Sequence, residues 1–282
     1  MLKTYYKLTK PGIIMGNAIT ATGGFFLASR GYFNLALLGY MLLGLSLIMA
    51  SGCVFNNYID RSIDKKMART KNRALVKGEI PVVNALVFAT CLLIGGSAIL
   101  EMFTNLLTLV VALIGFIVYV FIYTPMKTRS THGTLIGSIS GAVPPVVGYV
   151  TVSDKLDLGA LLLFLIIALW QMPHFFAIAM YRISEYKAAC IPVLPAVKGM
   201  YVTKVQMLIY TTAFLLTSLL PTVFGYTGYS YFTVAAILGL VWLVVCVKGF
   251  RAKNDNLWAR KMFKLSLFVI TALSIMISID TI

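Results

Sequence analysis

Charged side chains are scarce in this chain. Asp, Glu, Lys and Arg together make up only 12% of its 282 residues, and only 9 residues are acidic. Soluble domains carry about 25% charged residues, so this composition excludes a soluble globular domain of this length. Hydrophobic residues are abundant instead, at 60% of the sequence, and the mean hydropathy is +0.90. Such a chain is typical of polytopic helical membrane proteins.

Cysteine is also rare, and its spacing excludes a cysteine-based metal centre. The four cysteines, at positions 53, 91, 190 and 246, show no metal-ligand spacing, and we interpret them as small packing residues. The N-terminus lacks a cleavable signal pattern as well. Three lysines in its first ten residues precede an apolar run without a small-residue cleavage site, so we expect that run to remain as a membrane anchor.

Nine apolar runs are long enough to cross a bilayer, and the gaps between several of them are too short for any soluble domain. The sequence therefore predicts an all-α polytopic membrane protein with nine transmembrane helices, in which residues 1–282 form a single domain. The predicted spans are 11–29, 34–55, 82–103, 105–124, 134–152, 158–180, 205–225, 228–248 and 264–280.

The basic residues fall almost entirely on one side of the predicted membrane domain. If the spans alternate in direction, 22 of the 24 Lys and Arg residues share one side, and the other side keeps only Arg30 and Lys155. The positive-inside rule makes the rich side cytoplasmic, which places the N-terminus inside and the C-terminus outside. Topology thus accounts for the net charge of +15, and no nucleic-acid partner is needed.

The end of the second span carries Asn56, Asp60 and Asp64, each four residues from the next. On a helix this spacing places the three side chains on one face, about 6 Å apart. Hard oxygen ligands in this arrangement can hold Mg²⁺, which readily shares its shell with phosphate oxygens. Lys71 and Arg73 follow and would bind the same anion. The alternative is a helix cap with a solvated loop, but it leaves two carboxylates repelling each other on one face.

Two further polar clusters end the fourth and sixth spans. Tyr123 and Lys127 close span four, where a lone lysine is equally compatible with an interfacial anchor. His174 lies inside the apolar span six, where ionisable groups are costly and often functional, although a single histidine can also be a satisfied core residue. The end of span six then repeats the polar four-residue spacing, in Tyr181, Arg182, Glu185 and Lys187.

The placement of these clusters predicts how the spans are arranged. Spans one to four form one half and spans five to eight form the other, and each half has one polar site on the cytoplasmic side. We therefore expect two four-helix halves around a central cavity open to that side, plus one extra C-terminal helix. Pro144 and Pro145 interrupt the helix ladder of span five, which also indicates a site within the bundle.

Several motifs resemble those of the intramembrane (UbiA-type) aromatic prenyltransferases, which include 4-hydroxybenzoate polyprenyltransferase. The run from Asn56 to Arg73 resembles their first signature. Within the superfamily, the similarity is greatest to the branch that farnesylates heme, the heme O synthases, from about residue 5 to 280. It rests on residues 8–11, 123–127, 170–175 and 186–195, and the last two stretches indicate heme as the acceptor. Three positions depart from the pattern, Ala74 for Pro, Cys190 for Gly and Glu185 for Asp. The second acidic motif of other superfamily members is present here as Tyr181 and Glu185, which leaves open whether one or two metal ions bind.

The resemblance implies transfer of a farnesyl group from farnesyl diphosphate to the 2-vinyl group of heme b, with addition of water, giving heme O and pyrophosphate. It implies Mg²⁺ on Asn56, Asp60 and Asp64, and direct roles in catalysis for Asp60, Asp64, Lys127 and Tyr123. His174 would contact heme as an axial ligand, and Arg182 and Lys187 would pair with the propionates. The implied substrate-binding residues are Asn57, Lys71, Arg73, His174, Tyr181, Arg182, Glu185 and Lys187.

The resemblance also implies a setting and partners. The chain would lie in the bacterial cytoplasmic (inner) membrane, contact membrane lipid through the farnesyl tail, and supply terminal oxidase assembly or a heme A synthase. Three alternatives stay open at this point. They are a prenyltransferase for a quinone or another aromatic precursor, a transporter with a Mg²⁺-binding vestibule, and a heme chaperone that needs His174 but not the aspartates. A transporter would usually place its charges near the membrane midplane, whereas these gather on one face.

Overall fold

The computed structural model describes residues 2–32 and 34–282, and within them the chain is helical with a single isolated β-bridge, Thr227 to Thr281. Nine segments of the described part are long and apolar enough to cross a membrane, which confirms the predicted fold class. They are α2 (Pro11–Ser29), α3 (Leu35–Ile59), α6 (Val82–Phe103), the composite α7 (Leu106–Ile117), η1 (Val118–Tyr123) and α8 (Thr124–Met126), the pair α9 (Gly133–Gly141) and α10 (Val143–Ser153), α11 (Leu158–Tyr181), α14 (Gly199–Val223), α15 (Tyr229–Lys248) with η2 (Gly249–Arg251), and α16 (Asp255–Ile279).

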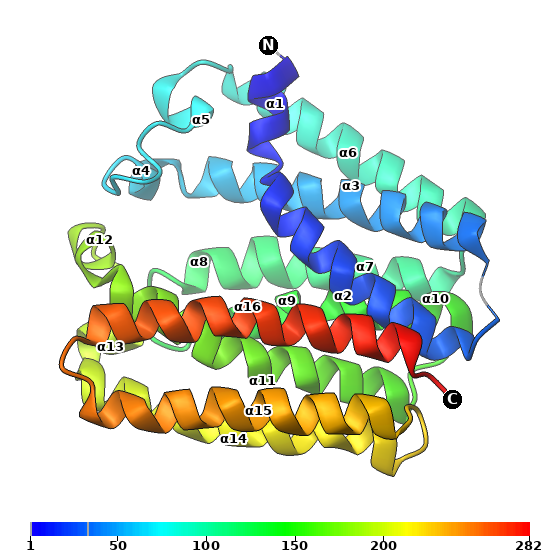
Figure 1. The fold of residues 1–282 in the computed structure, drawn as a ribbon. Helices are drawn as coiled ribbons and strands as arrows, with labels where there is room; N and C mark the ends of the chain where they lie inside the picture. Colours follow the sequence, from blue (N-terminus) through cyan, green and yellow to red (C-terminus); the bar gives the residue numbers. More distant parts are fainter. Residues whose placement is uncertain (1, 33) are drawn as a thin grey trace.

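The spanning helices lie side by side in one bundle, and the short helices gather at one end of it (Figure 1). Those at the left of Figure 1 are α4 (Arg61–Asp64), α5 (Ala74–Lys77), α12 (Ile183–Ala188) and α13 (Leu194–Val197). We call this the basic end, because it holds the lysine-rich and arginine-rich connections. The first helix, α1 (Leu2–Leu8), precedes α2, and the C-terminus lies at the opposite end of the bundle.

Three helices extend further toward the basic end than hydropathy predicts. Helix α3 continues to Ile59, α14 begins at Gly199 and α16 begins at Asp255, where the predicted limits were 55, 205 and 264. The extensions hold polar residues that satisfy one another: Lys204 Nζ donates to Asp255 Oδ1 at 2.6 Å. Charged side chains at helix ends can place their stems along apolar surface, so a helix continues past its apolar run.

The ninth spanning helix forms part of the bundle wall. Helix α3 packs against α6, α2 against α10, and α11 against α14, whereas α16 packs against α11, α2 and α15. The sequence predicted one extra C-terminal helix in addition to two four-helix halves, without a position for it. This helix, α16, joins the first span to the second half of the chain, because its buried stripe includes Met262, Val269 and Leu273, which pack into the main hydrophobic cluster.

The contact between α2 and α10 depends on glycine. A Cβ added at Gly148 would lie 1.9 Å from the Ala21 carbonyl oxygen, and one added at Gly24 would lie 2.0 Å from the Pro145 carbonyl oxygen. We expect Gly148→Ala to push these backbones apart, at about 1–3 kcal/mol for overpacking. The midpoint of thermal unfolding in detergent should fall by several degrees. Gly39→Ala, at a helical position with no neighbour within 4 Å, should not lower it, and equal midpoints for both variants would contradict the prediction.

Candidate active site

The first predicted motif forms a buried polar cluster where α3 ends. Asn56 and Asn57 lie in the last turn of α3, Asp60 caps that helix, and Asp64 ends α4. The Asp60 amide donates to the Asn56 carbonyl at 2.9 Å and the Asp64 amide donates to the Asp60 carbonyl at 2.8 Å, so the helical spacing is kept across the junction. All four residues are at most 4% exposed. Burial of two carboxylates is costly unless cations accompany them.

Each predicted metal ligand bonds to a basic side chain from another part of the chain. The pairs are Lys10 Nζ with Asn56 Oδ1 (2.6 Å), Lys127 Nζ with Asp60 Oδ2, and Arg73 Nη1 with Asp64 Oδ2 (2.6 Å). Three cations thus converge on three oxygen ligands within one small region. Paired cations and oxygen ligands suit a bound anion that also carries a metal ion. The basic side chains can bind the anion while the oxygens coordinate the metal.

Two buried oxygens of this cluster have no hydrogen-bond partner. They are Asp60 Oδ1 and Asn57 Oδ1, whereas Asn57 Nδ2 donates to the Leu8 carbonyl at 2.9 Å. A buried acceptor without a donor is costly, and a hard cation would satisfy it. The donor set therefore fits Mg²⁺. Among the described residues no three His, Cys, Asp or Glu side chains cluster, so amide and phosphate oxygens would have to complete the shell.

Lys10 is a site residue that the sequence analysis counted only toward topology and resemblance. Its backbone is left-handed (φ 53°, ψ 63°), which is unfavourable for a residue with a Cβ, and such strain concentrates at functional sites. Pro11 opens α2 directly after it, so the turn carries the Lys10 side chain to Asn56. Burial lowers the pKa of Lys10 to about 8. The Lys-Pro pair before the first span was the available signal.

A π-helical turn shapes the fourth span beside the cluster. Residues 118–123 form the π-helix η1, and π-turns inside α-helices are frequent at functional sites. Pro125 follows and cannot donate a backbone hydrogen bond. Thr124 Oγ1 donates to the Tyr119 carbonyl at 2.8 Å and accepts from Asn56 Nδ2 at 3.0 Å. The distorted turn is thereby tied to α3.

This turn presents two stacked tyrosines next to Lys127. The Tyr119 and Tyr123 rings lie 5.7 Å apart at 21°, and Lys127 Nζ lies 5.6 Å from the Tyr123 centroid. Gly133 packs against the backbone of Lys127, where a Cβ would come within 2.6 Å of the lysine Cα. The loop is therefore closed tightly enough to hold the ammonium group over both Asp60 and Tyr123.

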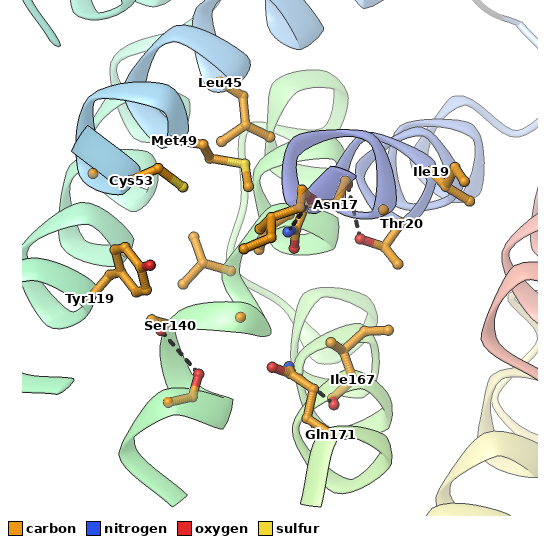
Figure 2. A pocket seen from close by; sticks show the side chains of 18 of the residues that line it. Asn17, Ile19, Thr20, Leu45, Met49, Cys53, Tyr119, Ser140, Ile167 and Gln171 are labelled. Atoms are coloured by element: carbon orange, nitrogen blue, oxygen red, sulfur yellow. Dashed lines mark hydrogen bonds between the residues drawn. The ribbon is translucent and has the colours of Figure 1, made fainter. Parts of the chain in front are cut away.

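A cavity of about 390 Å³ adjoins the polar cluster. Figure 2 shows Leu45, Met49 and Cys53 of α3 on one side, with Gln171 of α11 across from them. The cavity lining is mostly apolar. It reaches Cys53 and Tyr123, which lie one turn from Asn57 and Lys127 respectively. An apolar chamber thus begins where the charged cluster ends, and α16 contributes to its lining along with the earlier helices.

Of the cluster predicted at span six, His174 lines this cavity. It is 7% exposed, its Nδ1 lies 2.7 Å from Ser266 Oγ, and its ring stacks on Trp170 at 4.6 Å. Phe263 of α16 contacts both the His174 ring (4.9 Å) and the Tyr181 ring (5.7 Å). The imidazole is therefore held between α11 and α16 at the wall of the chamber.

The other predicted residues lie outside the cavity lining. Tyr181 packs on α16, and Arg182 Nη1 donates to Glu185 Oε1 at 2.9 Å. Glu185 Oε2 is buried without a partner. The side chains of Lys71 and Lys187 are exposed at the basic end. The structure thus brings together the first cluster, Lys127 and Tyr123, whereas the ion pair of Glu185 among the described residues is with its neighbour Arg182.

An unpredicted contact joins the two motif-bearing loops. Met67 packs with Ala189 and Ile191, and Tyr186 and Ile63 cover this small hydrophobic cluster. Burial raises the pKa of the Tyr186 phenol to about 12, so its hydroxyl stays protonated at neutral pH. The loop after α3 and the loop after α11 therefore form one structured cap at the basic end.

Comparison with known proteins agrees with this geometry. The sequence matches the UbiA prenyltransferase family over residues 17–268, and the chain belongs to that family. It is 52% identical over 281 residues to a protoheme IX farnesyltransferase of Yersinia pseudotuberculosis, covering 99% of this chain and 95% of the relative. Another of that name, from Protochlamydia amoebophila, is 52% identical over 280 residues and 99% of both chains.

Solved structures share the fold. One described as digeranylgeranylglyceryl phosphate synthase in membranes superimposes with a TM-score of 0.83 at 20% identity, over 99% of this chain and 98% of the other. A UbiA homologue from Archaeoglobus fulgidus bound to GPP and Mg²⁺ superimposes with a TM-score of 0.65 at 17% identity, over 98% and 99%. Family membership and the nine apolar helices of the described residues identify the chain as an integral membrane protein.

Proposed function

We propose that this chain transfers a farnesyl group from farnesyl diphosphate to the 2-vinyl group of heme b, with addition of water, to give heme O and pyrophosphate. The observation that carries the proposal is a buried acidic and basic cluster next to an apolar cavity, in a chain 52% identical to protoheme IX farnesyltransferases over nearly its whole length. Charged and apolar halves of one site suit a substrate with a diphosphate head and an isoprenoid tail.

The polar cluster binds the diphosphate. Asn56, Asp60 and Asp64 would hold Mg²⁺, with Asn57 nearby, and the ion when bound neutralises the diphosphate and improves it as a leaving group. Two unpartnered buried oxygens and the Mg²⁺ in the Archaeoglobus fulgidus homologue support this assignment. The anion is positioned by cations that already lie at the cluster, Lys10, Arg73 and Lys127, with Lys71 on the adjoining loop.

The apolar cavity accommodates the reactive carbon of the prenyl donor. The bond between C1 and oxygen breaks with its electron pair leaving on pyrophosphate, and the chain excludes water from the allylic cation in the apolar chamber. The faces of Tyr119, Tyr123 and Phe175 line that chamber and stabilise the cation. The vinyl π electrons form the new carbon–carbon bond. Water then adds to the cationic carbon next to the porphyrin and releases a proton.

The second half of the chain binds the acceptor. His174 contacts heme, and because Nδ1 is bonded to Ser266, Nε2 is the nitrogen left for iron. Arg182, which contacts Tyr181 and Glu185, binds a propionate, and Lys187 on α12 is the other cation expected there. The supporting observation is that His174 lines the cavity on α11 while Arg182 follows the same helix.

The charge distribution supports an orientation in the membrane. We place the basic end and the N-terminus on the cytoplasmic side of a bacterial inner membrane and the C-terminus outside, so that the site opens to the cytoplasm. The farnesyl tail reaches membrane lipid from the cavity. The product then passes to terminal oxidase assembly or to a heme A synthase.

Incubation of the purified protein with heme b, farnesyl diphosphate and Mg²⁺ tests the function. Heme O, identified by mass, and pyrophosphate should form in equal amounts, and EDTA should stop both. 4-Hydroxybenzoate in place of heme b should yield no prenylated product. Prenylated benzoate without heme O would instead favour the quinone-precursor enzyme. Heme or Mg²⁺ binding without any pyrophosphate would favour a carrier or transporter.

A further inference from the structure

Two arginines from different helices contact one tyrosine ring at the basic end. Arg182 Cζ lies 5.2 Å from the centroid of Tyr181, and Arg260 Cζ lies 5.6 Å from the same centroid. Arg182 follows α11 and Arg260 lies near the start of α16. Like charges brought close together repel unless an anion accompanies them, and stacking on an aromatic face holds a guanidinium plane in place.

These arginines keep unused hydrogen-bond donors. Arg182 uses one nitrogen on Glu185, and Arg260 Nε donates to Asn256 Oδ1 at 3.0 Å. Asn256 in turn donates to the Tyr181 carbonyl at 3.3 Å, which fixes the start of α16 against the end of α11. Within the described part of the chain, no acidic side chain pairs with Arg260. Because a guanidinium group carries five N–H donors, both arginines can still donate to a carboxylate.

Tyr181 and Arg260 each lie two helical turns beyond a residue that lines the cavity. On α16, Leu267 and Thr271 line the chamber, and Arg260 lies seven residues before Leu267 on the same stripe, about 10 Å along the axis. On α11, His174 lines the chamber and Tyr181 lies seven residues after it. Phe263 contacts both of these rings, so an aromatic surface runs from the chamber to the arginines.

We propose that Arg182 and Arg260 together bind the carboxylate arms of a flat aromatic acceptor whose ring system lies in the chamber. The inference rests on the proposed function, in which the acceptor is heme b and the arms are its two propionates. In this proposal Arg260 of α16 is the residue that binds the second propionate. Lys187, which was expected there, is exposed on α12 and contacts neither Tyr181 nor Arg182 through an ion pair or ring contact among those described.

The test compares heme b with its dimethyl ester, in which the propionates carry no charge. Binding is followed by heme absorbance without farnesyl diphosphate, and turnover with it. The wild type should bind the free acid about tenfold more tightly than the ester. Arg260→Gln should raise the KM for heme b about tenfold and leave that for farnesyl diphosphate and the affinity for the ester unchanged. Arg260→Lys keeps the charge but loses the planar guanidinium group with its paired donors. Its KM for heme b should therefore lie between those of the wild type and Arg260→Gln.

Lys261→Gln is the matched control, an exposed cation next to Arg260 on α16, and it should behave as the wild type. A preference for the free acid that persists in Arg260→Gln would overturn the assignment. So would its loss in Lys187→Gln alone. Absence of heme O with the wild type would refute the proposed function instead, because the comparison of acid with ester is read from binding without the prenyl donor.

Discussion

Asp60→Asn is expected to lower kcat/KM for heme O formation by about 10³-fold or more, which corresponds to about 4 kcal/mol of transition-state stabilisation. Asp60 is 4% exposed, pairs through Oδ2 with Lys127, and keeps Oδ1 buried without a donor. Asparagine preserves the shape but removes the anionic oxygen that a hard cation requires. The protein should still insert and fold, and the dependence on Mg²⁺ should shift to higher concentrations. Steady-state pyrophosphate release over a Mg²⁺ series measures both effects.

Asp255→Asn is the matched control for this variant. Asp255 is also paired with a lysine, Lys204 at 2.6 Å, and also lies at the basic end, but neither residue lines the cavity. Loss of that charge should change the activity by less than twofold. If Asp60→Asn kept more than a tenth of the wild-type activity, or if both variants lost activity equally, the metal and diphosphate assignment would be wrong.

Hydropathy was sufficient to predict the number and course of the spanning helices. Apolar runs of about 20 residues report bilayer thickness directly, and all nine recur among the described residues as helices. It was less informative about helix ends. Lys204 and Asp255 form a hydrogen-bonded ion pair and lie within helices that extend beyond the predicted limits. Hydropathy did not indicate which helices α16 packs against, because pairing between distant helices depends on side-chain fit rather than on composition.

The candidate site, like the fold, was predictable from the sequence only in part. The spacing of Asn56, Asp60 and Asp64 predicted one helix face, and the structure keeps it. Contacts made across the bundle had no local signal. Lys10 reaches Asn56 across 46 residues of sequence, and Tyr119 lines the cavity from a π-turn that hydropathy does not predict. Roles of individual residues in binding and catalysis stay predictions until the variants are measured.

Lys127→Met is expected to lower the rate of pyrophosphate release by about 10²–10³-fold, mainly in kcat. Negative charge builds up on the leaving diphosphate as the C1–O bond breaks, and the ammonium of Lys127 lies beside Asp60 and over Tyr123, where cluster and cavity meet. Methionine has a similar length without the charge. Single-turnover pyrophosphate release measures this step, and Lys127→Arg should restore part of the rate because it restores a cation.

Arg129→Met, two residues further on at an exposed position, removes a nearby positive charge and should leave the rate unchanged. The double variant Asp60→Asn with Lys127→Met then distinguishes two interpretations of the role of Lys127. If both residues act on one metal-bound diphosphate, the second substitution adds little after the first, because groups that act as a unit are strongly non-additive. Losses that simply multiply would show that Lys127 contributes independently of the metal ligands, as an interfacial anchor or a structural partner of Tyr123 would.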